Sequence, residues 1–123
     1  MTQVQITDSE LNRKLAELMG YSVRKSASCY QIIKGPSYGH WQAEESHAWA
    51  DAPDYCSDPA ASLEAGKAAI AKSQIDYLHN LSKVTNPNAD DFAPWTPDEI
   101  IKLLSATPRE RAEAAYITLS QKE

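Results

Sequence analysis

The chain has 123 residues, of which 42% are hydrophobic and 24% charged, so composition argues against a disordered protein and length favours a single domain over residues 1–123. It carries 12 Lys and Arg against 17 Asp and Glu, a net charge of −5, which disfavours binding to duplex DNA through phosphate contacts. The apolar runs are far shorter than the roughly 20 residues of a membrane-spanning helix. The N-terminal residues 1–6 lack the basic and apolar regions of a signal peptide, so we expect a cytoplasmic protein without membrane contact.

The two cysteines, Cys29 and Cys56, are too few and too widely spaced for a zinc ribbon or a redox pair. In a cytoplasmic protein we expect both to be free thiols, half-buried in a strand or a loop.

The first expected element is an amphipathic helix over residues 8–19. Residues Thr7 to Glu10 form a capping box, and one face of the helix then carries Leu11, Leu15, Leu18 and Met19. Gly20 follows as a residue that accepts the left-handed conformation, so the helix ends there.

Residues 21–49 are expected to form an antiparallel meander. The segments 21–24 and 28–34 are rich in aromatic and β-branched residues, which favour strands, and the turn-forming residues of 35–39 then reverse the chain. A less regular third strand is expected beyond the turn, on the spacing of Trp41, Ala43, His47 and Trp49.

A loop over 52–57 is followed by Asp58 and Pro59, which suit the N-cap and first position of a helix. The alanine-rich sequence that follows predicts one long helix from 59 to about 84, ended by the polar segment 86–91. Its broad apolar surface and small residues predict a stable homodimer or larger assembly.

The last third of the chain gives two conflicting signals. A second capping box, Thr96 to Glu99, favours a short helix over 97–104, whereas the apolar residues after it are also compatible with a buried strand over about 100–105. A third capping box, Thr107 to Glu110, begins a helix over 108–120.

Motifs of catalysis are scarce in this sequence. The four glycines form no phosphate-binding loop, and the spacing of His40, His47 and His79 does not suit a metal site, so we expect neither a metal nor a cofactor. Acidic side chains that might act as a base lie in expected loops, where Asp more often caps turns; they are Asp51, Asp54, Asp58, Asp90 and Asp91.

Two arginines begin the last expected helix. Arg109 and Arg111 lie in its first turn, where backbone N–H groups and the helix dipole favour an anion. The alternative is that Arg109 pairs with Glu113 on a solvated helix face.

Tyr55, Phe92 and Trp95 lie in expected loops, where aromatic side chains are more exposed than in the core and suit stacking on a base.

Taken together, the sequence resembles a group of small phage and prophage proteins with an α/β sandwich, among them the Thoeris anti-defence sponge family. The resemblance covers nearly the whole chain and is carried by ELNRKLAELMGY over 10–21, APDYCSDPAA over 52–61, ATPRERAEA over 106–114 and the pair Thr118-Leu119. It implies that the segment over 100–105 is a strand, and we take that interpretation.

The resemblance also implies a function. Members of that family bind cyclic ADP-ribose isomers made by bacterial TIR-domain enzymes without cleaving them, some bind cyclic oligonucleotides, and they assemble as dimers or trimers of dimers. Their pocket uses an aromatic face, an Asn-x-Asp element and arginines near the last helix. The matching candidates here, with one further cation from the strand region, are Arg24, Asn88, Asp90, Phe92, Trp95, Arg109 and Arg111.

We therefore expect an α+β domain in which helices flank a small antiparallel sheet. The expected function is sequestration of a cyclic nucleotide immune signal in the bacterial cytoplasm, by a homo-oligomer that is not an enzyme and binds no DNA or RNA polymer. One alternative is a phage-encoded adaptor or inhibitor that binds a protein. Another is a small nucleotide hydrolase with Asp54, Asp90 or Asp91 as its base.

Overall fold

The computed structural model describes residues 6–88 and 95–121. Nine elements follow in chain order: α1 (Asp8–Leu18), β1 (Ser22–Ser26), β2 (Cys29–Lys34), β3 (Ser37–Tyr38), α2 (Glu45–Ala50), α3 (Pro59–Lys72), α4 (Gln74–Thr85), α5 (Pro97–Leu104) and α6 (Pro108–Ser120). The fold is α+β, as the sequence predicts, with an antiparallel sheet of order β1-β2-β3. No helix in the described ranges has the length and apolar character needed to cross a membrane.

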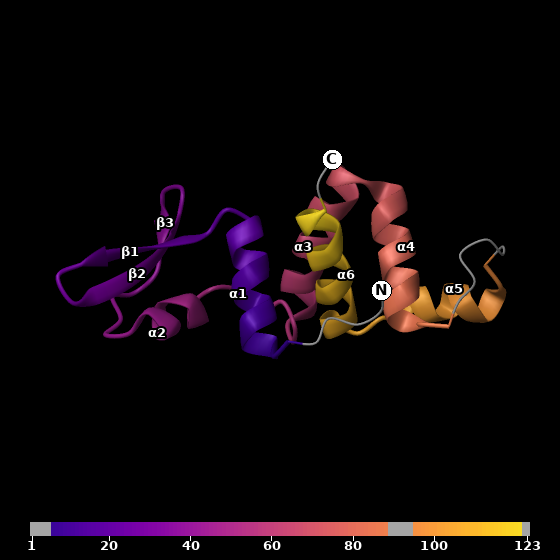
Figure 1. Cartoon of the computed structure of the whole chain (residues 1–123), viewed down its shortest axis with the longest axis horizontal. Coiled ribbons are helices and arrows are strands. Elements are labelled where there is room, and N and C mark those ends of the chain that lie inside the picture. Colours follow the sequence, from indigo (N-terminus) through magenta and orange to yellow (C-terminus); the bar gives the residue numbers. More distant parts are fainter. Residues whose placement is uncertain (1–5, 89–94, 122–123) are drawn as a thin grey trace.

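The molecule is elongated, with the sheet at one end and a bundle of helices beside it (Figure 1). Helix α6 packs against α3, α4 and α1, while α2 packs against β2 and β1. Helix α1 lies between the sheet and the bundle in the view, and α5 lies at the far end of the bundle (Figure 1). The sheet is therefore supported from one face and one end, and it projects from the helical part.

The bundle is held together by small side chains that let helices approach closely. Ala65 and Ala69 of α3 are fully buried, as are Ala112, Ala114 and Ala115 of α6, and Leu11 and Leu15 of α1 complete the same core. Gly66 lies beneath the hydroxyl of Tyr77, only 2.9 Å from where a Cβ would stand, so a larger residue there would separate α3 from α4.

Several boundaries agree with the sequence. Helix α1 begins at the predicted capping box, as do α5 and α6 at theirs, and in each the N-cap Thr accepts from the backbone of the Glu three residues later. Gly20 has a φ of +101°, which a glycine adopts without steric cost just after the helix. Asp58 caps α3 through its side chain, with Pro59 at the first helical position.

Three predicted elements are wrong. No strand forms over 41–49, where one was expected: β3 is Ser37–Tyr38, within the predicted turn, a single isolated bridge joins Tyr30 to Gln42, and residues 45–50 form α2. The helix expected over 59–84 is two helices, because Ser73 adopts an extended backbone, ends α3 and caps α4. The segment expected as a strand over 100–105 lies in helix α5, where the capping box and Pro97 decide between the two signals.

Candidate functional site

The register of the sheet separates its residues onto two faces. Arg24 stands opposite Gln31, and Ile33 opposite Tyr38, so these four side chains project from the same side of the sheet. Val23 and Ile32 project from the other side, where they belong to the core that includes Trp49 of α2. The first side is called the open face, defined by Arg24, Gln31, Ile33, Tyr38 and the neighbouring Trp41.

An arginine and a tryptophan are held together on the open face. The Arg24 guanidinium lies 5.4 Å from the centre of the Trp41 ring, and its Nε donates to Gln31 Oε1 at 2.7 Å. Gln31 is buried, and its Nε2 donates to the Gly39 carbonyl oxygen at 2.8 Å, so the amide orientation is fixed from below. Because this hydrogen bond holds Nε, the Arg24 side chain is ordered, and its two terminal nitrogens are held in position to donate to a ligand.

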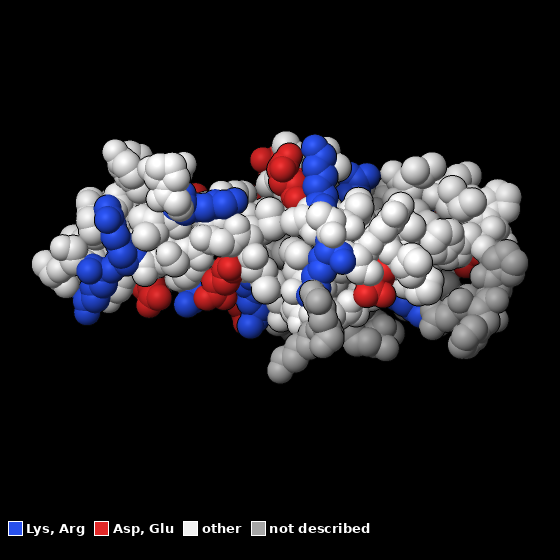
Figure 2. All heavy atoms as spheres, turned by 90° about the horizontal axis from the view of Figure 1, so that it is seen from above, with Lys and Arg blue, Asp and Glu red and all other residues white. Residues whose placement is uncertain are grey.

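The segment 21–41, which contains β1, β2 and β3, is called the hairpin. Two more of its cations lie over aromatic rings. Lys25 Nζ is 5.6 Å from the centre of the Tyr30 ring, and Lys34 Nζ is 4.8 Å from that of Tyr21. The hairpin's aromatic side chains remain accessible, since Tyr38 is 72% exposed and Trp41 46%. The hairpin occupies the left end of the space-filling view, where blue Lys and Arg side chains stand out (Figure 2).

The charges of the chain are segregated in sequence. Residues 18–43 contain Arg24, Lys25 and Lys34 and not one Asp or Glu, whereas all 17 acidic residues lie elsewhere with the remaining nine Lys and Arg. The total of −5 conceals this separation. An acidic protein with a locally basic hairpin concentrates anions at the hairpin rather than over its whole surface.

A hollow of about 150 Å³ lies beside the open face, between β2, β3 and the end of α2. It is lined by Tyr21, Ile32, Ile33, Lys34, Ser37, Tyr38, Gly39 and Asp51. Gly39 is required there, because a Cβ would stand 2.9 Å from Ile32 Cγ2 and 3.3 Å from an Asp51 carboxylate oxygen. On the open face itself, the Trp41 ring beside the Arg24 guanidinium suits a ligand that combines a planar base with phosphate.

Arg109, a predicted phosphate ligand, is engaged in a network that joins the two ends of the chain. Its Nε donates to Glu113 Oε2 at 3.0 Å, and its two terminal nitrogens donate to Asp8 Oδ1 at 2.6 Å and to the Ile6 carbonyl oxygen at 2.8 Å. The pairing with Glu113 is the alternative that the sequence offered, but the face is not solvated: the Arg109 side chain is 24% exposed and Glu113 9%.

Arg111 lies where α4, α5 and α6 meet. Its Nη2 approaches the Leu104 carbonyl oxygen at 3.5 Å, and among the described residues no carboxylate pairs with it. Burial raises the pKa of Tyr77, and the Arg111 charge opposes that rise. Its phosphate-binding role therefore stays a prediction.

The other predicted ligand residues are dispersed. Trp95 is 37% exposed and meets His79 edge to face, with ring centres 6.5 Å apart. Asn88 is exposed beyond α4, and Asp90 and Phe92 lie outside the described residues. Arg24 lies on the hairpin at one end of the molecule and the α6 arginines in its middle (Figure 1), so one chain does not bring the described members of this set together.

Tyr55 and Cys56, in the loop before α3, are buried in the structure. Tyr55, which was expected to be exposed, is 2% exposed and anchors its loop in the core. Cys56 is also buried, and burial together with the Asp8 charge raises the pKa of its thiol to about 11. Both thiols are free, as predicted, and the described ranges contain no cluster of His, Cys, Asp and Glu able to hold a metal ion.

Comparisons of the chain with protein-family models, with curated proteins and with solved structures find no match.

Proposed function

We propose that this protein binds a cyclic nucleotide signal of the cyclic ADP-ribose class and holds it without cleaving it, as a phage or prophage anti-defence protein in the bacterial cytoplasm. The family resemblance supplies the class of ligand. The observation that carries the proposal is the open face, where Arg24 and Trp41 stand together on a hairpin that is basic within an acidic chain.

Such a ligand consists of a base, riboses and a pyrophosphate. Trp41 and Tyr38 offer exposed aromatic faces for the base. Arg24 offers a guanidinium fork for the phosphates, while Lys25 and Lys34, which the register places on the other face of the sheet, add to the positive charge of the hairpin. This assignment retains Arg24 from the predicted set and moves the stacking role to Trp41.

Titration calorimetry with a cyclic ADP-ribose isomer tests the proposal. The wild-type protein is expected to bind, and heating the complex is expected to release the ligand unaltered. Trp41→Ala is expected to lower affinity by about tenfold or more, since one base stack contributes about 1–3 kcal/mol. Arg24→Ala should cost at least as much, since hydrogen bonds to charged groups contribute about 1.5–3 kcal/mol.

Matched variants at the other predicted site are the control. Arg111→Ala and Trp95→Ala replace the same residue types away from the hairpin and should leave affinity within about threefold, about 0.7 kcal/mol. A loss with Arg111→Ala and not with Arg24→Ala would place the nucleotide at the start of α6. Altered ligand after heating would show an enzyme, and no uptake by the wild-type protein would overturn the proposal.

The exposed apolar face of α5 favours a second candidate function, that of an adaptor or inhibitor that binds a protein. Ile100, Ile101 and Leu104 are 43%, 59% and 74% exposed. Apolar side chains gathered on one helix face are typical of protein contacts. For this function, Leu104→Glu should abolish binding of a bacterial protein, and Arg24→Ala should leave that protein bound. For the nucleotide proposal, Arg24→Ala should weaken nucleotide binding, and Leu104→Glu should leave it unchanged.

A further inference from the structure

A second hollow, of about 280 Å³, lies between α1, α2 and the loop that follows α2. It is lined by Ser9, Asn12, Ser46, Trp49, Ala50, Ala52 and Asp54. It shares no lining residue with the hollow beside the open face. Residues of two helices and a loop thus line a space of mixed character, polar at Ser9, Asn12, Ser46 and Asp54 and apolar at Trp49, Ala50 and Ala52.

One wall of this hollow is fixed by Asn12. The Cys56 backbone N–H donates to Asn12 Oδ1 at 3.0 Å, which settles the orientation of the amide and directs its NH₂ toward Asp54. Asn12 Nδ2 then donates to Asp54 Oδ1 at 2.9 Å. The amide and the carboxylate are therefore held side by side before any ligand arrives.

The loop that carries Asp54 is itself ordered. The Asp54 carbonyl oxygen accepts from the backbone of Ser57 at 3.3 Å and of Asp58 at 2.8 Å, which closes a turn. The next residue, Tyr55, is buried in the core. Since Asn12 is bonded to Oδ1, the Oδ2 oxygen of Asp54 is the acceptor that a ligand would meet.

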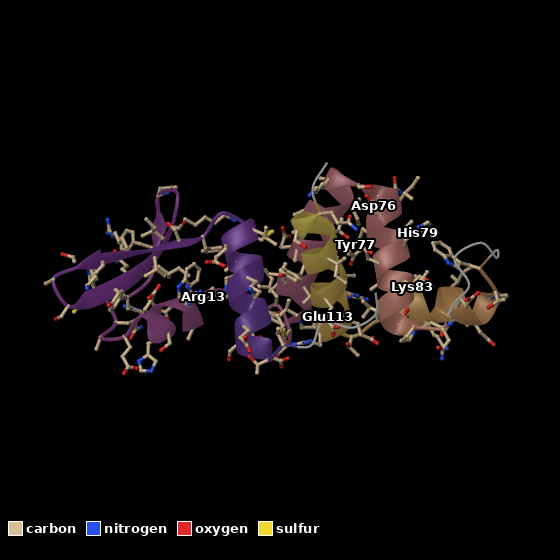
Figure 3. The ribbon with its side chains drawn as sticks, viewed as in Figure 1. Arg13, Asp76, Tyr77, His79, Lys83 and Glu113 are labelled. Atoms are coloured by element: carbon tan, nitrogen blue, oxygen red, sulfur yellow. The ribbon has the colours of Figure 1, made fainter. Side chains whose placement is uncertain are left out.

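The charge beside the hollow disfavours a phosphate. Arg13, labelled in Figure 3, lies 4.8 Å from the centre of the Trp49 ring but is balanced by Glu17 at 3.8 Å and Glu45 at 3.6 Å. With Asp54 added, these four side chains carry more negative than positive charge. The hollow differs in this respect from the basic hairpin, so it suits a neutral ligand.

We propose that this hollow binds a single sugar ring through two adjacent hydroxyl groups. One hydroxyl would donate to Asp54 Oδ2 and its neighbour would accept from Asn12 Nδ2, while the serine hydroxyls of the lining meet the rest of the ring. The C–H groups of the sugar would meet the apolar part of the lining, which is formed by Ala50, Ala52 and the small exposed part of Trp49. The volume of 280 Å³ holds one ring and not a dinucleotide.

Tryptophan fluorescence and amide NMR shifts of the full chain test this assignment. A Trp41→Phe, Trp95→Phe variant leaves Trp49 as the sole tryptophan. Titration of this variant with ribose and with glucose should change its emission with a millimolar Kd for at least one of them, and the comparison distinguishes a five-membered from a six-membered ring. In the wild-type protein the same sugar should shift the amides of Ser9, Asn12, Ser46 and Asp54.

Asp54→Ala is expected to weaken sugar binding at least tenfold, while Asp51→Ala, from the same loop region but facing the other hollow, should leave it unchanged. Equal affinity in wild type and Asp54→Ala would overturn the assignment. So would shifts confined to other residues, or no response to either sugar at about 100 mM, well above a millimolar Kd. The emission of Trp49 and these amide shifts report on the second hollow and not on the open face. Absence of sugar binding would therefore leave the nucleotide proposal standing, and absence of nucleotide binding would leave the sugar proposal standing.

Discussion

Replacing Arg109 should destabilise the protein rather than weaken ligand binding. Its guanidinium joins Glu113 on its own helix to Asp8 and the Ile6 carbonyl at the start of the chain. Glu113 is nearly buried, with 9% of its side chain exposed. In Arg109→Ala the Glu113 carboxylate would remain in the packed interface between α6 and its neighbours without this partner, and the N-terminal contact would be lost as well.

The size of the effect follows from burial. Removing one partner of a fully buried ion pair costs about 3–5 kcal/mol, because the other charge is left desolvated. Arg109 is 24% exposed and Asp8 64%, so water screens part of the network. We therefore expect a loss of about 2–3 kcal/mol, and a melting temperature lowered by about 10 °C for a domain of this length.

Urea unfolding at neutral pH measures this loss, with Arg111→Ala as the matched control because it removes the same side chain two residues away. The control should stay within about 0.5 kcal/mol of wild type. Adding Glu113→Gln to Arg109→Ala should recover at least about 1 kcal/mol, since the nearly buried carboxylate that Arg109 neutralised is then removed. A change below about 0.5 kcal/mol in Arg109→Ala would refute the reasoning and return the pair to a solvated helix face.

Three further predictions concern the thiol, the helix packing and the assembly. The pKa of Cys56 is raised to about 11 from an ordinary value of 9.0, so the neutral thiol stabilises the fold below pH 9. That contribution is lost as the pH rises toward 11. The urea midpoint should therefore fall between pH 9 and pH 11, and it should fall less in Cys56→Ala. Gly66→Ala should destabilise by about 1–3 kcal/mol despite its better helix propensity, because a Cβ meets the Tyr77 hydroxyl, and calorimetric melting should show the loss relieved in a Tyr77→Phe background. Light scattering at micromolar concentration should show a homodimer or larger assembly that buries more than about 1,000 Å², consistent with Leu63, Ile70 and Ile75 being 51%, 45% and 66% exposed on α3 and α4, and a monomer mass would refute it.

Local signals in the sequence marked the starts of α1, α3, α5 and α6, but not those of α2 and α4. Each capping box is a contact between residues three apart, so nothing distant in the chain alters it, and all three begin helices. Ser73 shows the limit of periodicity, because the apolar pattern continues across a residue that serves as both the end of α3 and the cap of α4. The strand expected over 100–105 was wrong for a related reason: a short apolar run has no period of its own, and the cap before it decided the outcome.

The candidate site was less predictable because it depends on distant pairings. The Arg24–Trp41 contact joins residues seventeen positions apart, and only the hairpin register brings them together. The contact of Arg109 with Asp8 spans nearly the whole chain, so the sequence revealed its Glu113 partner but not the network that engages it. The absence of Asp and Glu over 18–43 was visible in the sequence, and a windowed charge count would have found it where the total of −5 did not.

The distribution of charge and packing separates stability from binding in this fold. The helices carry most of the core, to which the sheet adds Ile32 fully and Val23 in part, so the open face is free to display polar and aromatic side chains without a cost in packing. All acidic residues lie outside 18–43 in the sequence, where they repel an anion, while the three cations of the hairpin attract it. Because α2 and its two caps carry Glu44, Glu45 and Asp51, and α2 packs against β1 and β2 at the same end of the molecule (Figure 1), the attraction of an anion to the hairpin is weakened on the side that α2 covers and is strongest on the open face.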